Sequence, residues 1–156
     1  DVVSVSRGTR VRIATLDDAP AWGAMRRDLW PDEEAVDSID SLKHALERGG
    51  EAVAFLAEND DGAAIGFAEA TLRHDYVNGT ETSPVGFLEG WYVVPAWRGR
   101  GVGRSLITAV EDWTRAQGCS ELASDALLDN LDSHAAHTRC GFDETERVVC
   151  FRKVLA

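Results

Sequence analysis

The 156-residue chain lacks the features that mark several large classes of protein. Its three cysteines are odd in number and have no metal-ligand spacing, so we expect free thiols rather than a disulfide framework or a zinc site. No apolar run reaches the length that spans a bilayer, and no signal-peptide pattern opens the chain. These absences indicate a cytoplasmic protein.

Positive charge is scarce as well. The chain has 16 lysines and arginines against 27 aspartates and glutamates, which gives a formal net charge of −11. This balance argues against nucleic acid and anionic membranes as partners and suits a cationic substrate. The histidines form no ligand cluster in the sequence, so we expect no metal. They are His44, His74, His134 and His137.

The composition is that of a globular domain, with 44% hydrophobic and 28% charged residues. We expect residues 1–9 to be an N-terminal extension or remnant outside the core, and residues 10–156 to form a single domain. Apolar periodicity and turn residues predict strands at 10–14, 51–58, 63–73, 88–95, 120–126 and 146–154, and helices at 19–29, 32–48, 102–117 and 130–140. The order β-α-α-β-β-β-α-β-α-β predicts an α/β (α+β) fold, a mixed central sheet with helices on both faces.

The chain is organised around Leu88–Pro95, a β-branched and aromatic run that predicts a central strand. Proline ends this strand because it has no N–H to donate to a ladder. Arginines and glycines alternate through Arg98–Arg104, and a helical apolar pattern begins at Val102. Free N–H groups at a helix start, glycines that admit a ligand and arginine charge together predict a site for a phosphate-bearing anion.

This loop resembles the Arg/Gln-x-x-Gly-x-Gly/Ala pyrophosphate loop of the GCN5-related N-acetyltransferases (GNAT), on Arg98, Gly101 and Gly103. It does not have the spacing of the nucleotide P-loop or of the dinucleotide fingerprint. The resemblance implies the GNAT fold and acetyl-CoA as cosubstrate, with pantetheine along the preceding strand. The residues expected to bind acetyl-CoA are Trp91, Tyr92, Val93, Arg98, Gly99, Arg100, Gly101, Val102, Gly103, Arg104 and Asn130.

The second half of the chain extends this resemblance. Asn130, Ser133, Gly141 and Phe142 keep the spacing of the family pattern Asn-x-x-Ser/Ala-x-x-x-Tyr-x-x-x-Gly-Phe. His137 stands where many members have a tyrosine that is proposed to protonate the leaving thiolate. Histidine titrates near neutrality, so His137 is a candidate general acid, and a partly buried hydrogen-bonding histidine is the alternative.

Several stretches are similar to one branch of the family, the aminoglycoside 6′-N-acetyltransferases. They are Asp28–Pro31, Gly66–Ala70, Arg73–Gly79, Ser83–Pro84, Phe87–Gly90, Ala123–Asp125 and Gly141–Arg147. The resemblance implies acetyl transfer to the 6′-amino group of an aminoglycoside, hence antibiotic resistance, by a homodimeric enzyme. At the matching positions, Trp30, Tyr76, Glu89, Asp125 and Glu146 would line the aminoglycoside site.

The chemistry of such a site can be argued from the residues. A polycationic amino sugar needs carboxylates for its ammonium groups and an aromatic face for its ring. Glu89 interrupts an apolar strand, and alternation predicts that it shares a face with Phe87 and Trp91. A salt bridge with an arginine is the alternative for Glu89, and a turn or capping aspartate is the alternative for Asp125.

Either Glu89 or Asp125 is a candidate to accept the proton of the amine, and a backbone N–H near Val93 is the expected oxyanion donor. Direct attack in a ternary complex requires no covalent acetyl-enzyme, and the cysteines sit in unpromising places for one. Two rival functions remain. In the first, the enzyme acetylates another small polyamine. In the second, the chain is a non-catalytic regulator that binds acetyl-CoA.

Overall fold

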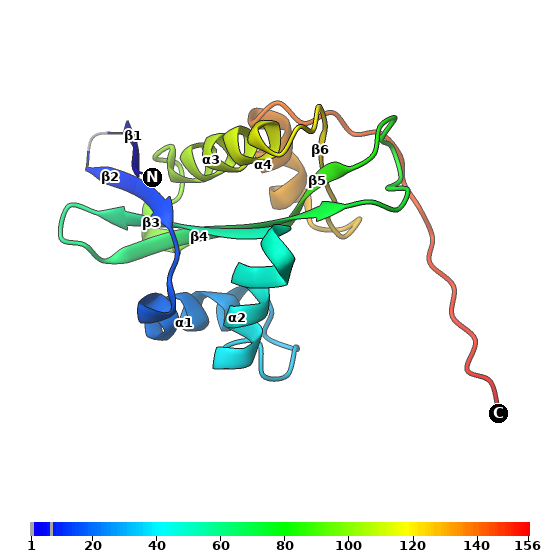
Figure 1. Cartoon of the computed structure of the whole chain (residues 1–156), viewed down its shortest axis with the longest axis horizontal. Helices are drawn as coiled ribbons and strands as arrows, with labels where there is room; N and C mark the ends of the chain where they lie inside the picture. The colour runs from blue at the N-terminus through cyan, green and yellow to red at the C-terminus, as the bar shows by residue number, and fades with distance from the viewer. Residues whose placement is uncertain (1, 7) are drawn as a thin grey trace.

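The computed structural model describes residues 2–6 and 8–156, and a mixed sheet of six strands runs through its centre (Figure 1). The strands lie side by side in chain order, and every neighbouring pair is antiparallel except β5 and β6, which are parallel. Their bounds are β1 Val2–Ser6, β2 Thr9–Ile13, β3 Ala52–Asn59, β4 Ala64–Arg73, β5 Val85–Val93 and β6 Leu122–Ser124.

Helices cover both faces of this sheet (Figure 1). On one face lie α1 Ala19–Leu29 and α2 Ile39–Glu47, and on the other lie α3 Val102–Ala116 and α4 Leu131–Arg139. Because β3 is sandwiched between the two layers, its residues 52–58 are all buried. The predicted α/β fold with a mixed sheet is therefore confirmed.

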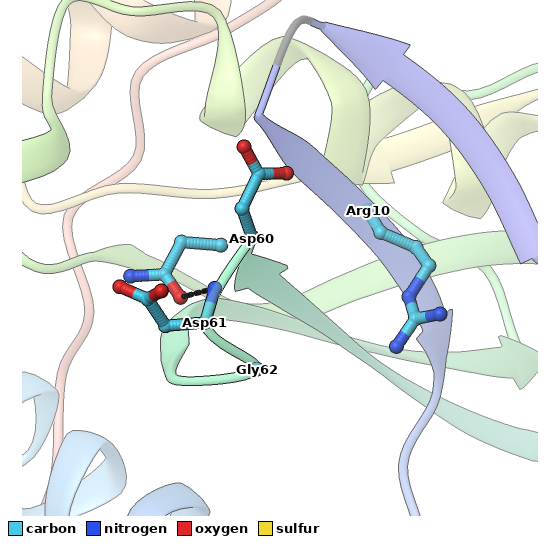
Figure 2. Close-up of a pocket in the computed structure, with 5 residues that line it drawn as sticks. Arg10, Asp60, Asp61 and Gly62 are labelled. Atoms are coloured by element: carbon cyan, nitrogen blue, oxygen red, sulfur yellow. Dashed lines mark hydrogen bonds between the residues drawn. The ribbon is translucent and has the colours of Figure 1, made fainter.

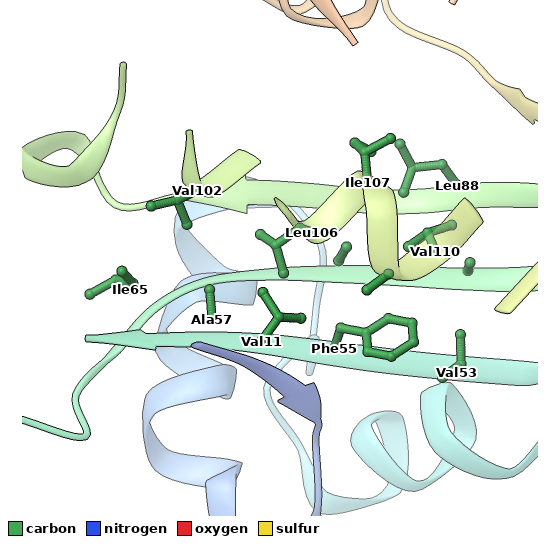
Figure 3. Close-up of a cluster of buried hydrophobic side chains, with 13 residues drawn as sticks. Val11, Val53, Phe55, Ala57, Ile65, Leu88, Val102, Leu106, Ile107 and Val110 are labelled. Atoms are coloured by element: carbon green, nitrogen blue, oxygen red, sulfur yellow. The ribbon is translucent and has the colours of Figure 1, made fainter. Parts of the chain in front are cut away.

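Two apolar clusters hold the layers together. The larger one joins the sheet to α3 through Val102, Leu106 and Val110, which recur every four residues along the helix (Figure 3). The smaller one joins the opposite face to α1 and α2 around Trp22, Leu42 and Phe67, each of which is fully buried. The site described below lies where β5 passes between these two clusters.

Two segments differ from the sequence predictions near the N-terminal half. Residues 1–9 were expected outside the core, but Val2–Ser6 form β1 on the edge of the sheet and Thr9 opens β2. Residues 1 and 7 lie outside the described part of the chain. The helix predicted over 32–48 begins only at Ile39, because Ala35 adopts a positive φ of 52° and the Ser38 hydroxyl accepts from the Ser41 N–H as a cap.

The predicted closing strand over 146–154 is not formed. Residues 143–156, which follow Phe142, are exposed and form no strand, and the chain leaves the body of the protein as a long tail (Figure 1). A strand needs a neighbour for its backbone N–H and C=O groups, and the tail does not pass along a sheet edge of its own chain. In the described residues, no helix is long and apolar enough to cross a membrane.

Candidate active site

A β-bulge at Glu89 organises the site. In the β4–β5 pairing, Glu69 lies opposite Gly90 while Ala70 lies opposite Leu88, so Glu89 is the extra residue of β5. The bulge resets the alternation of side chains along the strand. Glu89 shares the α1 and α2 face with Phe87, as predicted, but Trp91 packs on the α3 side, so the predicted shared face of Glu89 and Trp91 is wrong.

Beyond the bulge, β5 has a free edge. Strand β6 pairs only with Gly86, Phe87 and Leu88 and ends at Ser124, whereas β5 continues to Val93. The Val94 N–H donates to the Ile65 carbonyl of β4 at 2.9 Å, and amides alternate in direction along a strand, so the Val93 N–H points to the other edge. That edge is open for the backbone-like amides of an extended ligand.

The predicted anion loop lies at the end of this free edge. Gly101 has a φ of 85°, which L side chains rarely adopt, and α3 begins directly after it. The first hydrogen bond of the helix runs from the Ser105 N–H to the Gly101 carbonyl at 3.1 Å. The N–H groups of the turn before Ser105 have no intrahelical acceptor, so the helix start has donors available for the predicted anion.

The side chains of the loop are fixed by their own contacts. Arg98 Nε donates to the Val93 carbonyl at 2.8 Å, which ties the loop to the end of β5. The Arg100 guanidinium lies 4.9 Å from the Trp97 ring, and Trp91 Nε1 donates to the Gly103 carbonyl at 3.1 Å. Three of the predicted acetyl-CoA residues thus brace the loop, while Gly99 and Gly101 stay exposed.

Trp30 and Glu89 come together on the opposite face of β5. The Trp30 ring covers Gly90, where an added Cβ would lie 2.6 Å from the ring. It also contacts Phe67 edge-on at 6.1 Å between centroids, and the Arg26 guanidinium lies 4.9 Å from its centre. Since Gly90 follows Glu89 directly, an aromatic face and a carboxylate stand side by side, as the predicted acceptor site requires.

Glu89 is not free in this structure. Thr71 Oγ1 donates to Glu89 Oε1 at 2.7 Å, and the Arg73 guanidinium donates to both carboxylate oxygens at 3.0 and 3.1 Å. The arginine salt bridge that the sequence left open as an alternative is therefore formed. It does not exclude a binding role, because both side chains remain partly open to solvent.

Both ring nitrogens of His137 are occupied. Nδ1 lies 2.7 Å from the Ser133 carbonyl, which can only accept, so this nitrogen carries the hydrogen of the neutral ring. Nε2 lies 2.7 Å from Ser124 Oγ at the end of β6 and accepts from it. The ring also packs edge-on against Trp91 and Phe142. These contacts favour the alternative interpretation of a hydrogen-bonding, partly buried histidine over a general acid.

The other predicted site residues are more scattered. Asn130 caps α4, its side chain accepting from the Ser133 N–H at 3.2 Å. Asp125 is exposed just beyond the last residue of β6, and Tyr76 is exposed on the loop between β4 and β5. Glu146 is exposed and lies on the tail. Tyr92 faces the α1 side, where its hydroxyl donates to Asp28 at 3.3 Å and burial raises its pKa.

The sequence did not reveal the ion pair beneath this site. Arg26 of α1 donates to both oxygens of Glu69 on β4, and Trp22 Nε1 donates to the same carboxylate at 3.0 Å. Burial raises the pKa of Glu69, while these donors act in the opposite direction. Arg26 also donates to the Val36 carbonyl at 2.7 Å, so one side chain links α1 and the turn before α2 to the sheet under Trp30.

A hollow at the β3–β4 turn is unrelated to these residues (Figure 2). It is lined by Arg10 and by the turn residues 59–62. The Asn59 side chain accepts from the Asp61 and Ala63 N–H groups at 3.0 Å each, which explains the shape of the turn without a ligand.

The cysteines have no catalytic setting. Burial raises the pKa of the Cys119 and Cys140 thiols, which disfavours the nucleophilic thiolate. Cys150 lies on the exposed tail. Across residues 2–6 and 8–156, no three His, Cys, Asp or Glu side chains gather in a group that could hold a metal ion.

Comparison with known proteins gives a consistent picture. The model of the acetyltransferase (GNAT) family matches residues 20–142. An aminoglycoside N(6′)-acetyltransferase type 1 from Stenotrophomonas maltophilia is 55% identical over 151 residues, covering 97% of either chain. The protein of the same name from Serratia marcescens is 48% identical over 143 residues, covering 92% of this chain and 97% of the relative.

Solved structures agree with this. The 6′-N-acetyltransferase AAC(6′)-Ih from Acinetobacter baumannii superposes with a TM-score of 0.88 at 42% identity, over 96% of this chain and 100% of the other. AAC(6′)-Iy, solved with the bisubstrate analogue CoA-S-monomethyl-acetylneamine, gives a TM-score of 0.87 at 41% identity with the same coverage. With a family model over most of its length and relatives that match it nearly end to end, the chain belongs to the acetyltransferase (GNAT) family.

Proposed function

We propose that this enzyme transfers the acetyl group of acetyl-CoA to the 6′-amino group of aminoglycosides and so confers resistance to them. The observation that carries the proposal is the bulged strand β5, which has an open edge leading to an anion loop on one side and Glu89 beside Trp30 on the other. The names of the relatives, which specify the 6′ position, support the same acceptor.

The chain has the groups that acetyl-CoA needs. The start of α3 after Gly101 and the arginines of the loop suit the pyrophosphate, and the free edge of β5 suits the amides of pantetheine. When bound, acetyl-CoA supplies an activated thioester. The Val93 N–H is the donor best directed to stabilise the negative charge that develops on the acetyl oxygen.

On the acceptor side, the protein provides carboxylates and an aromatic wall. We assign Glu89 and Asp125 to the ammonium groups of the sugar, Trp30 and Tyr76 to its rings, and Glu146 to a distal amine. Glu89 is the stronger candidate for accepting the proton of the attacking amine, because it stands on β5 next to the edge where the thioester is expected. Holding both substrates together would supply much of the rate.

The test is thiol release from acetyl-CoA with a panel of amines. We expect turnover with kanamycin and none with an analogue that carries a hydroxyl at the 6′ position. Turnover with spermidine in place of kanamycin would favour the polyamine function. Binding of acetyl-CoA without transfer to any amine would overturn the enzymatic proposal and favour a regulator.

We also infer that the chain acts as a homodimer that exchanges its C-terminal tail. The tail carries five exposed apolar residues that an isolated chain leaves in water, and Phe151 is 93% exposed. They are Val148, Val149, Phe151, Val154 and Leu155. Val149, Phe151 and Leu155 would share one face of an extended strand, so the segment has the pattern of a strand without a partner.

The matching acceptor surface belongs to a second copy. Strand β6 is the last strand of the sheet, and Leu127, Leu128 and Leu131 are exposed just after it. The tail cannot fold back easily, because Thr145 is packed so closely against Gly79 of the β4–β5 loop that a Cβ added there would clash with the Thr145 side chain. Pairing each tail with β6 of the partner would cover both apolar sets in a closed two-fold assembly.

Light scattering of the full chain and of a variant that ends at Thr145 tests this inference. We expect a dimer for the full chain and a monomer after truncation. Phe151→Glu should weaken the dimer, whereas Ile39→Glu, which charges an exposed apolar residue of α2, should leave it intact. A monomeric full chain, or a truncated chain that still dimerises, would contradict the exchange.

We further propose that residues 10–156 form one acetyltransferase domain, to which β1 adds an edge strand. The three cysteines are free, which is consistent with the reducing cytoplasm that we propose as its location.

A further inference from the structure

The carboxylate proposed to bind substrate already holds a cation. Arg73 Nη2 lies 3.0 and 3.1 Å from the two oxygens of Glu89, and Arg73 Nε lies 3.3 Å from Oε1. The guanidinium carbon also lies 3.5 Å from the centre of the Phe87 ring, which supports it from below. Before any acceptor arrives, an arginine of the protein therefore occupies the position that a substrate ammonium group would take.

This pair differs from a buried arginine–glutamate pair on the same face. The Arg26 and Glu69 side chains are only 10% and 8% exposed, so separating them would leave a charge buried without a partner. The Arg73 and Glu89 side chains are 42% and 29% exposed. An ion pair this exposed contributes little to stability, and its arginine can move into water at a small cost in free energy.

The place of Arg73 also lets it move. It is the last residue of β4, and the loop that carries Tyr76 follows it directly. Its guanidinium is bonded to Glu89 and stacked on Phe87, so release from Glu89 does not require the strand to change.

We propose that Arg73 is a specificity-determining residue, an internal counter-ion that a polycationic acceptor must displace from Glu89. The proposal rests on the proposed function and concerns the same site. An acceptor with several ammonium groups compensates for the displacement by pairing with the other acidic residues of the chain, whereas an amine with a single charge cannot. Arg73 thus biases the enzyme toward polycations and keeps Glu89 neutralised when the site is empty.

Replacing Arg73 with Met tests the competition, since Met keeps apolar contact with Phe87 and removes the charge. We expect kanamycin to bind about three- to tenfold more tightly, with a lower KM and little change in kcat. A simple amino sugar with one ammonium group should gain more than kanamycin does. Arg73→Lys, which keeps the positive charge, should lie near the wild type.

The control must remove the same charge elsewhere, because any lost cation attracts a polycation to an acidic protein. Arg27→Met serves, since Arg27 forms an exposed pair with Asp37 on the outer side of α1. It should change kanamycin affinity less than twofold. In a Glu89→Gln background, Arg73→Met should change kanamycin affinity no more than Arg27→Met does, because the competition has been removed.

Calorimetric binding of kanamycin separates the possible failures. If Arg73→Met weakens binding or lowers kcat, Arg73 orients Glu89 instead, and the displacement proposal is overturned. An equal gain in the Arg27→Met control would also overturn it. If the wild type binds no aminoglycoside at all, the proposed function fails first, and that result is distinct from both.

Discussion

The two ligand regions of this enzyme are assembled in opposite ways. The anion loop is one continuous stretch, Arg98–Arg104, braced by the end of β5 and the start of α3. The proposed acceptor residues come from five separate places along the chain, and one of them lies on the tail. A contiguous loop keeps its geometry by local bonds, whereas a composite surface depends on how distant segments meet. The cofactor region is therefore suited to stay fixed while the acceptor region varies.

The two regions are also supported by different kinds of contact. Apolar contacts between α3 and the sheet support the anion loop. On the acceptor side, the Trp30 ring, called here the acceptor wall, packs against Arg26 of the buried Arg26–Glu69 ion pair. Four substitutions test this comparison.

The largest effect is expected from Glu69→Ala. It leaves the buried Arg26 without a counter-ion, so the free energy of unfolding should fall by about 3–5 kcal/mol. Urea denaturation at pH 7 and one fixed protein concentration measures it. The double variant Arg26→Met with Glu69→Leu should recover most of the loss, because it removes both charges. If Glu69→Ala alone is as stable as the wild type, the Arg26–Glu69 pair does not stabilise the structure beneath Trp30.

Glu89→Gln should impair the acceptor region and leave the acetyl-CoA region unchanged. We expect kcat/KM for kanamycin to fall about a hundredfold, since the variant loses both a proton acceptor and a negative charge. The Kd of acetyl-CoA, measured by calorimetry, should not change. Glu34→Gln, an exposed glutamate in the turn before α2, is the matched control. An equal loss of acetyl-CoA affinity would show that the two regions are not independent.

Gly101→Val is expected to weaken the anion loop and to leave the acceptor region unchanged. A β-branched residue at a φ of 85° strains the loop by about 1–3 kcal/mol, so acetyl-CoA should bind roughly ten- to a hundredfold more weakly. Gly62→Val provides the control, since Gly62 has a φ of 78° in the β3–β4 turn and equally open surroundings. Kanamycin affinity should hold in both variants. Equal acetyl-CoA affinities for the two would remove the loop from the proposed binding site.

The smallest effect is expected from His137→Phe. The ring contacts with Trp91 and Phe142 are kept and only the bonds to Ser124 and Ser133 are lost. We expect kcat to change less than about threefold and the pH profile of kcat to keep its shape. A drop of a hundredfold with loss of one titration step would instead establish His137 as the general acid.

Local features of the site followed from the sequence. The strand, the glycine turn and the start of α3 were predicted because Pro95, Gly101 and the spacing of Val102, Leu106 and Val110 act within a few residues. The general architecture followed for the same reason, since hydrophobic period and turn residues mark each element.

Features that depend on pairing between strands did not follow. The bulge at Glu89 exists only in the alignment of β5 with β4, and it overturned the shared face of Glu89 and Trp91. The bond from Arg73 to Glu89 joins residues 16 apart in the chain, and its partner was not identifiable among the arginines. The tail has a strand pattern, but a pattern does not say which chain supplies the neighbour.

The bulge fixes which face of the sheet each later residue of β5 occupies. One extra residue allows Glu89 to face the acceptor wall while Trp91, two positions later, faces α3. Deleting Trp91, beyond the bulge, would move Tyr92 to the α3 face and Val93 to the α1 face, whereas deleting Glu89 or Gly90 would only remove the bulge and leave the later side chains in place. Among related sequences, insertions and deletions should therefore avoid this strand and gather in the β4–β5 loop, where an added residue alters the acceptor region without inverting the cofactor edge.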